Sequence, residues 1–280
     1  MKIVRKANGR NHWYIDEDAD GARVPGVTTL VGGGLPKPAL LNWAGDATAE
    51  YAMDNWDELS LLPGSERLKK MKGGRYEKRD AAANRGTQVH KLAERLMADE
   101  RVTVPDELTG YVQSCVRFLD DFQLRPFYVE AVVYSETRRH VGTLDLIADV
   151  LLPDMPEYDH IERDADGFSR GLLDWKTSRS GIFGDVAMQL APYRFSEWLI
   201  VPGTEDVVPM PEVQFCAGIH LRPDGYSFVP LLCGEEQYRD FLYIKETARI
   251  VDSLRDLVGE PIVPPTASRF VLAKADEVEG

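Results

Sequence analysis

The segment GLLDWKTS, residues 171–178, constrains the fold more than any other part of this 280-residue chain. Its apolar start predicts a strand buried in a sheet, because a short apolar run between polar residues is typical of such strands. Asp174 and Lys176 lie two residues apart, so the period of a strand places both on one face. A buried carboxylate is costly unless it is paired or bound to a metal ion. The strand is therefore expected to end at a polar site.

A second aspartate, Asp145, stands in another apolar segment, VGTLDLIADVL at 141–151. This segment also predicts a strand, and the two strands are expected to be neighbours. Two carboxylates with a lysine beside them form a site for a hard divalent cation such as Mg²⁺ or Mn²⁺. Lys176 could hold or help to deprotonate a water molecule and stabilise developing negative charge.

The order of elements predicts an α/β or α+β fold with a central mixed β-sheet flanked by helices. The first third of the chain should hold a small hairpin and a glycine-rich turn, then helices joined by a loop or broken helix. The residues expected for these are 1–35 for the hairpin and turn, 37–56 for the first helix, 58–75 for the loop, and 77–100 and 107–124 for two further helices.

The remainder should alternate strands and helices. A hairpin, a third strand, a helix containing Pro192, two more strands and a closing helix are expected. Their residues are 127–135 and 141–151 for the hairpin, 171–177 for the third strand, 185–200 for the helix, 212–223 and 226–232 for the last strands, and 235–258 for the closing helix. The tail 277–280 is expected to fray.

Charge is distributed unevenly along the chain. The net charge is −13, which argues against general binding to polyanions. Residues 66–85 nevertheless hold eight basic and three acidic side chains, and Lys72, Arg75, Arg79 and Arg85 are among the basic ones. Such a segment could guide a phosphate backbone to one place. A charge run by itself equally fits a solvated helix face or loop.

The bulk composition excludes several classes of protein. No run of about 18 uncharged apolar residues occurs, so no membrane span is expected. The basic N-terminus is not followed by the apolar segment of a secretory signal. The three cysteines, Cys115, Cys216 and Cys233, are odd in number and far apart, which fits free thiols in a reducing cytoplasm.

Four motifs in order resemble those of the PD-(D/E)XK nuclease superfamily, most closely its RecB-like and Cas4-like phage exonuclease branch. They are RGTQVHKLAE (85–94) with Gly86 and His90, GTLDLI (142–147) with Asp145, DWK (174–176), and QLAPY (189–193) with Gln189 and Tyr193. The resemblance implies a restriction-endonuclease-like core in a single nuclease domain over 1–280. Residues 1–76 would form an N-terminal hairpin, helical and basic segment, and residues 77–260 the nuclease core.

The resemblance also implies roles for individual residues. The metal ligands would be His90, Asp145, Asp174 and the backbone carbonyl of Trp175, and one or two Mg²⁺ or Mn²⁺ ions would bind. Lys176 would position or activate the attacking water. Gln189 and Tyr193 would contact DNA or brace the site, or would have a purely structural role. Glu94 could form a hydrogen bond in the site or pair with a cation, and Glu130 could support the ligands without being expected to bind the metal itself; the role of each is left open.

The implied activity is a metal-dependent DNA exonuclease in recombination, replication or repair, in a bacterial or phage-infected cell. A recombinase or a replication protein could be its partner, and its oligomeric state is left open. Two alternatives remain: a structure-specific or nicking endonuclease of the same fold, and a nucleic-acid-binding subunit whose active site has decayed. Cas4 proteins hold an iron–sulfur cluster on four cysteines, and only three are present here, so no cluster is expected.

Overall fold

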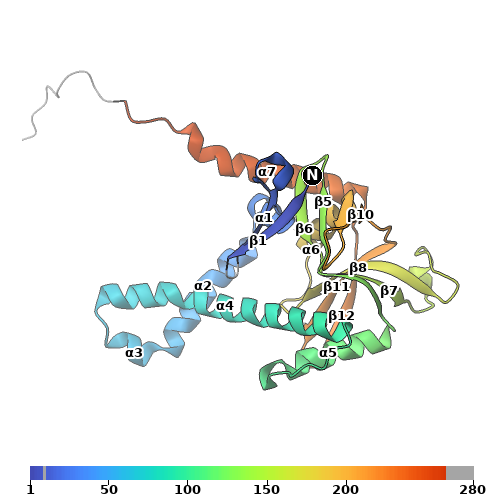
Figure 1. Cartoon of the computed structure of the whole chain (residues 1–280). Helices are drawn as coiled ribbons and strands as arrows, with labels where there is room; N and C mark the ends of the chain where they lie inside the picture. Colours follow the sequence, from blue (N-terminus) through green and yellow to red (C-terminus); the bar gives the residue numbers. More distant parts are fainter. Residues whose placement is uncertain (9–10, 263–280) are drawn as a thin grey trace, which may run out of the picture.

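A five-stranded sheet in the order β12-β11-β8-β7-β4 forms the centre of the chain (Figure 1). Its strands are β4 (Arg125–Val129), β7 (Leu146–Leu151), β8 (Phe168–Lys176), β11 (Phe215–Arg222) and β12 (Gly225–Leu231). The β8–β11 pair is parallel and the other pairs are antiparallel. This computed structural model describes residues 1–8 and 11–262. The predicted mixed sheet with flanking helices is confirmed.

Helices cover both faces of this sheet, and alternate residues of β8 face opposite layers. Leu173 and Trp175 pack against α4 (Gly64–Met97) and α5 (Thr109–Asp121). Leu172 packs with α1 (Val27–Gly34), α6 (Gly184–Arg194) and α7 (Glu235–Ser253). Asp174 follows the period of Leu172 and therefore lies on the α6 side of the sheet.

A second sheet, in the order β10-β9-β5-β6, adjoins the first and changes the predicted hairpin. Its strands are β5 (Val132–Ser135), β6 (His140–Thr143), β9 (Trp198–Ile200) and β10 (Val207–Pro209). The expected strands 127–135 and 141–151 are each broken in the middle, so the hairpin runs from one sheet into the other. Glu130, with φ 53°, lies in the left-handed region at one break. Two backbone bonds close this fork: Glu130 N–H donates to the Asp145 carbonyl (3.0 Å) and Leu144 N–H to the Ala131 carbonyl (2.9 Å).

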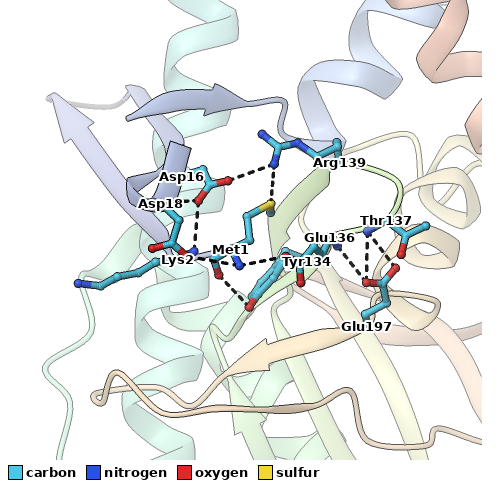
Figure 2. Close-up of polar contacts among 9 residues, drawn as sticks. All are labelled: Met1, Lys2, Asp16, Asp18, Tyr134, Glu136, Thr137, Arg139 and Glu197. Carbon is cyan, nitrogen blue, oxygen red and sulfur yellow. Dashed lines mark hydrogen bonds and ion pairs between the residues drawn. The ribbon is translucent and has the colours of Figure 1, made fainter. Parts of the chain in front are cut away.

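The N-terminal hairpin is confirmed and gains a third strand. The three strands are β1 (Ile3–Asn8), β2 (Asn11–Asp16) and β3 (Ala22–Val24). Figure 2 shows how this small sheet is held beside the β5–β6 turn: Arg139 Nη1 donates to the Asp16 carboxylate (3.1 Å), and the Tyr134 hydroxyl donates to the Met1 carbonyl (3.2 Å). The expected glycine-rich turn is wrong, because its residues belong to α1, whose Val27 and Leu30 enter the core.

The expected loop at 58–75 is also wrong. After α2 (Pro38–Asp54) and the short α3 (Trp56–Ser60), the chain enters α4 at Gly64 and stays helical for 34 residues. Glycines 73 and 74 suggested a loop, but a side chain at Gly74 would collide with the Tyr51 ring of α2. This glycine permits two helices to touch. Arg67 ties the α3 end to α4 by donating to the Leu59, Ser60 and Leu62 carbonyls.

Several smaller outcomes concern the rest of the chain. The helix expected at 185–200 ends at Arg194, because residues 198–200 pair as β9 with β5 and β10. The closing helix ends at Ser253 and continues as a short 3₁₀ helix, Leu254–Leu257. The tail 277–280 lies outside the described residues. The cysteines are free and buried, as predicted. Among the helices described here, none has the length and apolar character needed to cross a bilayer.

Candidate active site

Three potential metal ligands meet where the two sheets part. His90 comes from α4, and Glu130 and Asp145 come from the two breaks of the fork. One ligand atom from each of these side chains lies within 4.8 Å of the others. A nitrogen and two carboxylate oxygens at this separation could hold one hard divalent cation such as Mg²⁺ or Mn²⁺.

The Trp175 peptide group joins this cluster at the end of β8. Its N–H donates to Asp145 Oδ2 (2.9 Å), and its carbonyl oxygen lies 3.0 Å from His90 Nε2. His90 Nδ1 lies 3.6 Å from Asp145 Oδ2. His90, Asp145 and the Trp175 carbonyl, which the sequence motifs grouped together, are therefore neighbours in space. The Trp175 side chain points into the core and is 2% exposed.

Gly86 explains how α4 comes so close to β8. A Cβ atom at this position would lie 3.3 Å from Thr177 Oγ1, a tight contact immediately after the strand. His90 lies about one turn further along the same face of α4, so this close approach directs the imidazole to the end of β8. The glycine inside a helical segment thus serves packing at the site, and it does not start the helix.

Asp174 and Lys176 form an ion pair beside the cluster of His90, Glu130 and Asp145. Lys176 Nζ contacts Asp174 Oδ2, and Gln189 Nε2 of α6 donates to Asp174 Oδ1 (3.1 Å). Asp174 is 1% exposed, so both its oxygens are directed at protein groups. The sequence motifs assigned Asp174 to the metal, whereas the three-residue cluster contains Glu130 in its place.

The acidic groups of this region are shifted by burial and by one another. Burial, reinforced by the charge of Asp145, raises the pKa of Glu130 to about 7. The same two causes raise the pKa of Asp174 to about 6, against the opposing effect of Lys176. Burial works to lower the pKa of Lys176, but the carboxylates of Asp174 and Asp145 outweigh it, and the pKa is raised. Carboxyl groups crowded in this way favour binding of a cation.

Tyr193 is not available to a ligand. Its side chain is 2% exposed and packs so closely on β6 that a side chain at Gly142 would collide with its ring. Burial raises the pKa of the phenol well above its ordinary value. Contact with DNA is therefore excluded for Tyr193 in this conformation, and support of α6 beside Gln189 is the role that its position allows.

A pocket of about 350 Å³ opens beside the ion pair, between β8, α1 and the start of α6. Lys176 and Gln189 line it, and Ser178 and Ser180 add hydroxyl groups. Phe183 also lines it and is 58% exposed. The polar end of β8 is thus accessible from outside, with an exposed aromatic ring next to it.

The basic side chains predicted to hold DNA do not line this cluster. Lys72, Arg75 and Arg79 precede His90 on α4 by 11 to 18 residues, or about 16–27 Å along the helix axis. Arg85 lies on another side of the helix, with its guanidinium 5.7 Å from the centre of the Tyr111 ring, in a pocket of about 410 Å³ between α4 and α5. That this segment holds a phosphate backbone near the site stays a prediction, and the structure places its side chains along α4 ahead of His90.

Glu130 is the site residue that the sequence motifs did not assign. A signal was present: a carboxylate in an apolar segment, opposite Asp145 in the predicted hairpin. Its left-handed backbone is a second indication, since strained residues often occur at functional sites. Glu94, on α4 after His90, is exposed, and its charge also contributes to the raised pKa of Glu130.

Comparison with known protein families finds no family model that matches this chain, and no curated protein matches it either.

Proposed function

We propose that this chain is a divalent-metal-dependent nuclease of the PD-(D/E)XK type, with a restriction-endonuclease-like core. One observation carries the proposal: His90, Glu130 and Asp145 gather their ligand atoms within 4.8 Å, at the end of the strand that also bears Asp174 and Lys176. A mixed sheet with helices on both faces is compatible with that core. The end of β8 that carries the charged residues is also where the accessible pocket lies.

The residues present fit a Mg²⁺ or Mn²⁺ ion, which His90, Glu130, Asp145 and the Trp175 carbonyl would hold. When bound, such an ion supplies positive charge to a phosphoryl group and acidifies water. Lys176 holds an ammonium group next to the cluster, where it can orient a water molecule and offset the negative charge that develops on a phosphodiester under attack. Asp174, fixed by Gln189, keeps that ammonium charged and in place.

The substrate in this proposal is DNA, cleaved from its ends, in recombination, replication or repair. The chain as a whole is acidic, but residues 66–85 of α4 carry an excess of basic side chains, which favours binding of a polyanion there. Exposed Phe183, which lines the pocket beside Lys176, offers a surface on which a base next to the scissile phosphate can stack.

The test is cleavage of end-labelled linear and closed circular DNA, single- and double-stranded, with Mg²⁺, Mn²⁺ or chelator. Metal-dependent loss of linear DNA alone supports an exonuclease. Cleavage of circles supports an endonuclease with the same site. The absence of cleavage with either metal on every substrate, by a protein shown to be folded, would rule out the proposed activity.

A further inference from the structure

The N-terminal part of α4 projects from the body of the molecule as one side of a helical arm, residues 38–84, which α2 and α3 complete (Figure 1). The C-terminal part of the same helix crosses the sheet and carries His90. One continuous rod therefore connects the metal cluster with the end of the arm. Any property that repeats along one face of α4 forms a straight line leading away from the site.

Basic residues repeat on that face. Lys72 precedes His90 by 18 residues, which is about five turns of helix, so the two side chains leave α4 in the same direction. Arg79 precedes His90 by 11 residues, about three turns, and Tyr76 by 14, about four turns, so both lie close to the same line. Lys72, Tyr76 and Arg79 are all exposed. Between Arg79 and His90 the line passes Ala83, which is small and exposed, and then Gly86, where Thr177 at the end of β8 comes close to the helix.

Tyr76 is held in an unusual setting on this line. The guanidinium of Arg75 lies 4.8 Å and that of Arg79 lies 4.9 Å from the centre of its ring. Arg75 also donates to the Tyr76 hydroxyl (2.8 Å), and Arg79 contacts Asp80. The ring is nevertheless 44% exposed. An exposed aromatic ring with two guanidinium groups beside it combines a surface for stacking with two positive charges, the features that bind a nucleobase and its adjoining phosphates.

We infer that the His90 face of α4 is a track for a single strand of nucleic acid that extends from the metal cluster along the arm. The inference rests on the proposed function for its ligand. A single strand fits better than a duplex because only an unpaired base can stack on Tyr76. The length from His90 to Lys72, about 27 Å, corresponds to about eight nucleotides at the 3.4 Å rise of a stacked strand, and to fewer in an extended one.

Binding measured in chelator tests the track without any cleavage. Fluorescence anisotropy with labelled oligothymidylates of increasing length should show affinity that rises up to about eight nucleotides and then levels off. The double variant Lys72→Ala/Arg79→Ala should bind a 12-nucleotide strand about tenfold more weakly, with little change for a strand of about three nucleotides. The slope of log affinity against log salt should become shallower by about 0.7 for each phosphate group that the variant no longer neutralises. Tyr76→Leu should weaken single-strand binding and leave any duplex binding unchanged.

The matched control is Lys91→Ala. Lys91 is an exposed lysine of the same helix, but it lies about 100° around the axis from His90. This variant should bind the 12-nucleotide strand as the unaltered protein does. Equal weakening in Lys91→Ala and in the double variant would overturn the track and indicate a general charge effect. If the protein bound duplex more tightly than single strands, and Tyr76→Leu did not change this, the inference that the track holds a single strand would be overturned.

If the track is correct and the proposed nuclease is not, length-dependent binding persists without cleavage. If the nuclease is correct and the track is not, cleavage of the 12-nucleotide strand is unchanged in the double variant.

Discussion

The two halves of α4 differ in almost every physical property, although they belong to one helix. The half after Gly86 contributes Val89, Leu92 and Ala93 to the core that covers β8. The arm contributes no residue to the three core clusters formed by the described residues, and it exposes Leu41, Met53 and Leu61. The half after Gly86 is therefore held by tertiary packing, whereas the half in the arm is held mainly by its own helical bonds and by α2.

This difference determines how charge acts in each half. Around His90 the ionisable groups are partly or fully buried, where low dielectric makes each interaction strong and changes the pKa of a carboxyl group. On the arm the charges are exposed, so single pairs such as Lys70–Glu58 contribute little to stability. Their combined field can still attract an extended polyanion, and salt weakens it.

The largest effect is expected at Lys176. Lys176→Ala removes the ammonium group from the cluster and leaves Asp174 buried beside Gln189. Metal-dependent cleavage should fall by about 10³-fold, as measured by single-turnover kinetics. Lys176→Gln keeps a polar partner for Asp174 and should show the same loss with less change in stability, while Lys91→Ala should cleave normally. A near-normal rate in Lys176→Gln would disprove a catalytic ammonium group.

Truncation of an apolar side chain should lower the free energy of unfolding much more in the core around β8 than in the arm. Leu173, buried in β8, is 0% exposed, whereas Leu61, at the tip of the arm, is 85% exposed. Leu173→Ala should lower the free energy of unfolding by about 3 kcal/mol because it leaves a cavity. Leu61→Ala should change it by less than about 0.5 kcal/mol. Urea denaturation measures both. Comparable losses would mean that the arm is packed against a surface of the molecule or of a partner.

Glu130→Gln tests whether the third ligand is correctly identified. Loss of a carboxylate ligand should weaken Mn²⁺ binding by about 10- to 100-fold in isothermal titration calorimetry. Glu94→Gln is the matched control, since Glu94 is an exposed carboxylate on α4 whose charge also reaches Glu130. It should change the affinity by less than about threefold. If both variants bind Mn²⁺ normally and Asp174→Asn does not, the ligand set predicted by the motifs is correct and the cluster with Glu130 is not.

Much of the fold was predictable because periodicity reports burial directly. The central strands β8 and β11 and the helices α5 and α7 follow from apolar pattern alone. The exceptions occur where pairing with a strand distant in sequence determines the secondary structure. Residues 127–135 form one apolar stretch in sequence, and only the left-handed backbone of Glu130 divides it between two sheets. Residues 198–200 continue a helical pattern but become β9 because β5 offers an edge for pairing.

The site was predictable to the extent that local spacing determines it. Asp174 and Lys176 must share a face of β8, and His90 must follow Gly86 by about one turn. Glu130 could not be assigned in the same way, since its place depends on how two sheets diverge. The positions of Lys72 and Arg75 relative to His90 could not be assigned either, because a loop was predicted at 58–75, where the chain in fact continues as α4. These are long-range facts, and the local sequence carries only weak signals of them.

The smallest effect expected is on stability as a function of pH, and it tests whether the groups around His90 are buried. Glu130 has a folded-state pKa of about 7, above its ordinary value of 4.5, so the folded protein holds this proton more tightly than the unfolded chain. The free energy of unfolding without metal should therefore fall as pH rises from about 5 to about 8. Screening of this partly exposed group reduces the expected difference between the unaltered protein and Glu130→Gln to about 2 kcal/mol over that range. Guanidinium denaturation in chelator measures this difference.

Mg²⁺ added at about pH 8 should restore the lost stability in the unaltered protein and less of it in the variant, because metal binding to the folded state opposes the repulsion between carboxylates. An identical pH dependence in both proteins would show that Glu130 is solvated and that the groups around His90 are not held in a region of low dielectric.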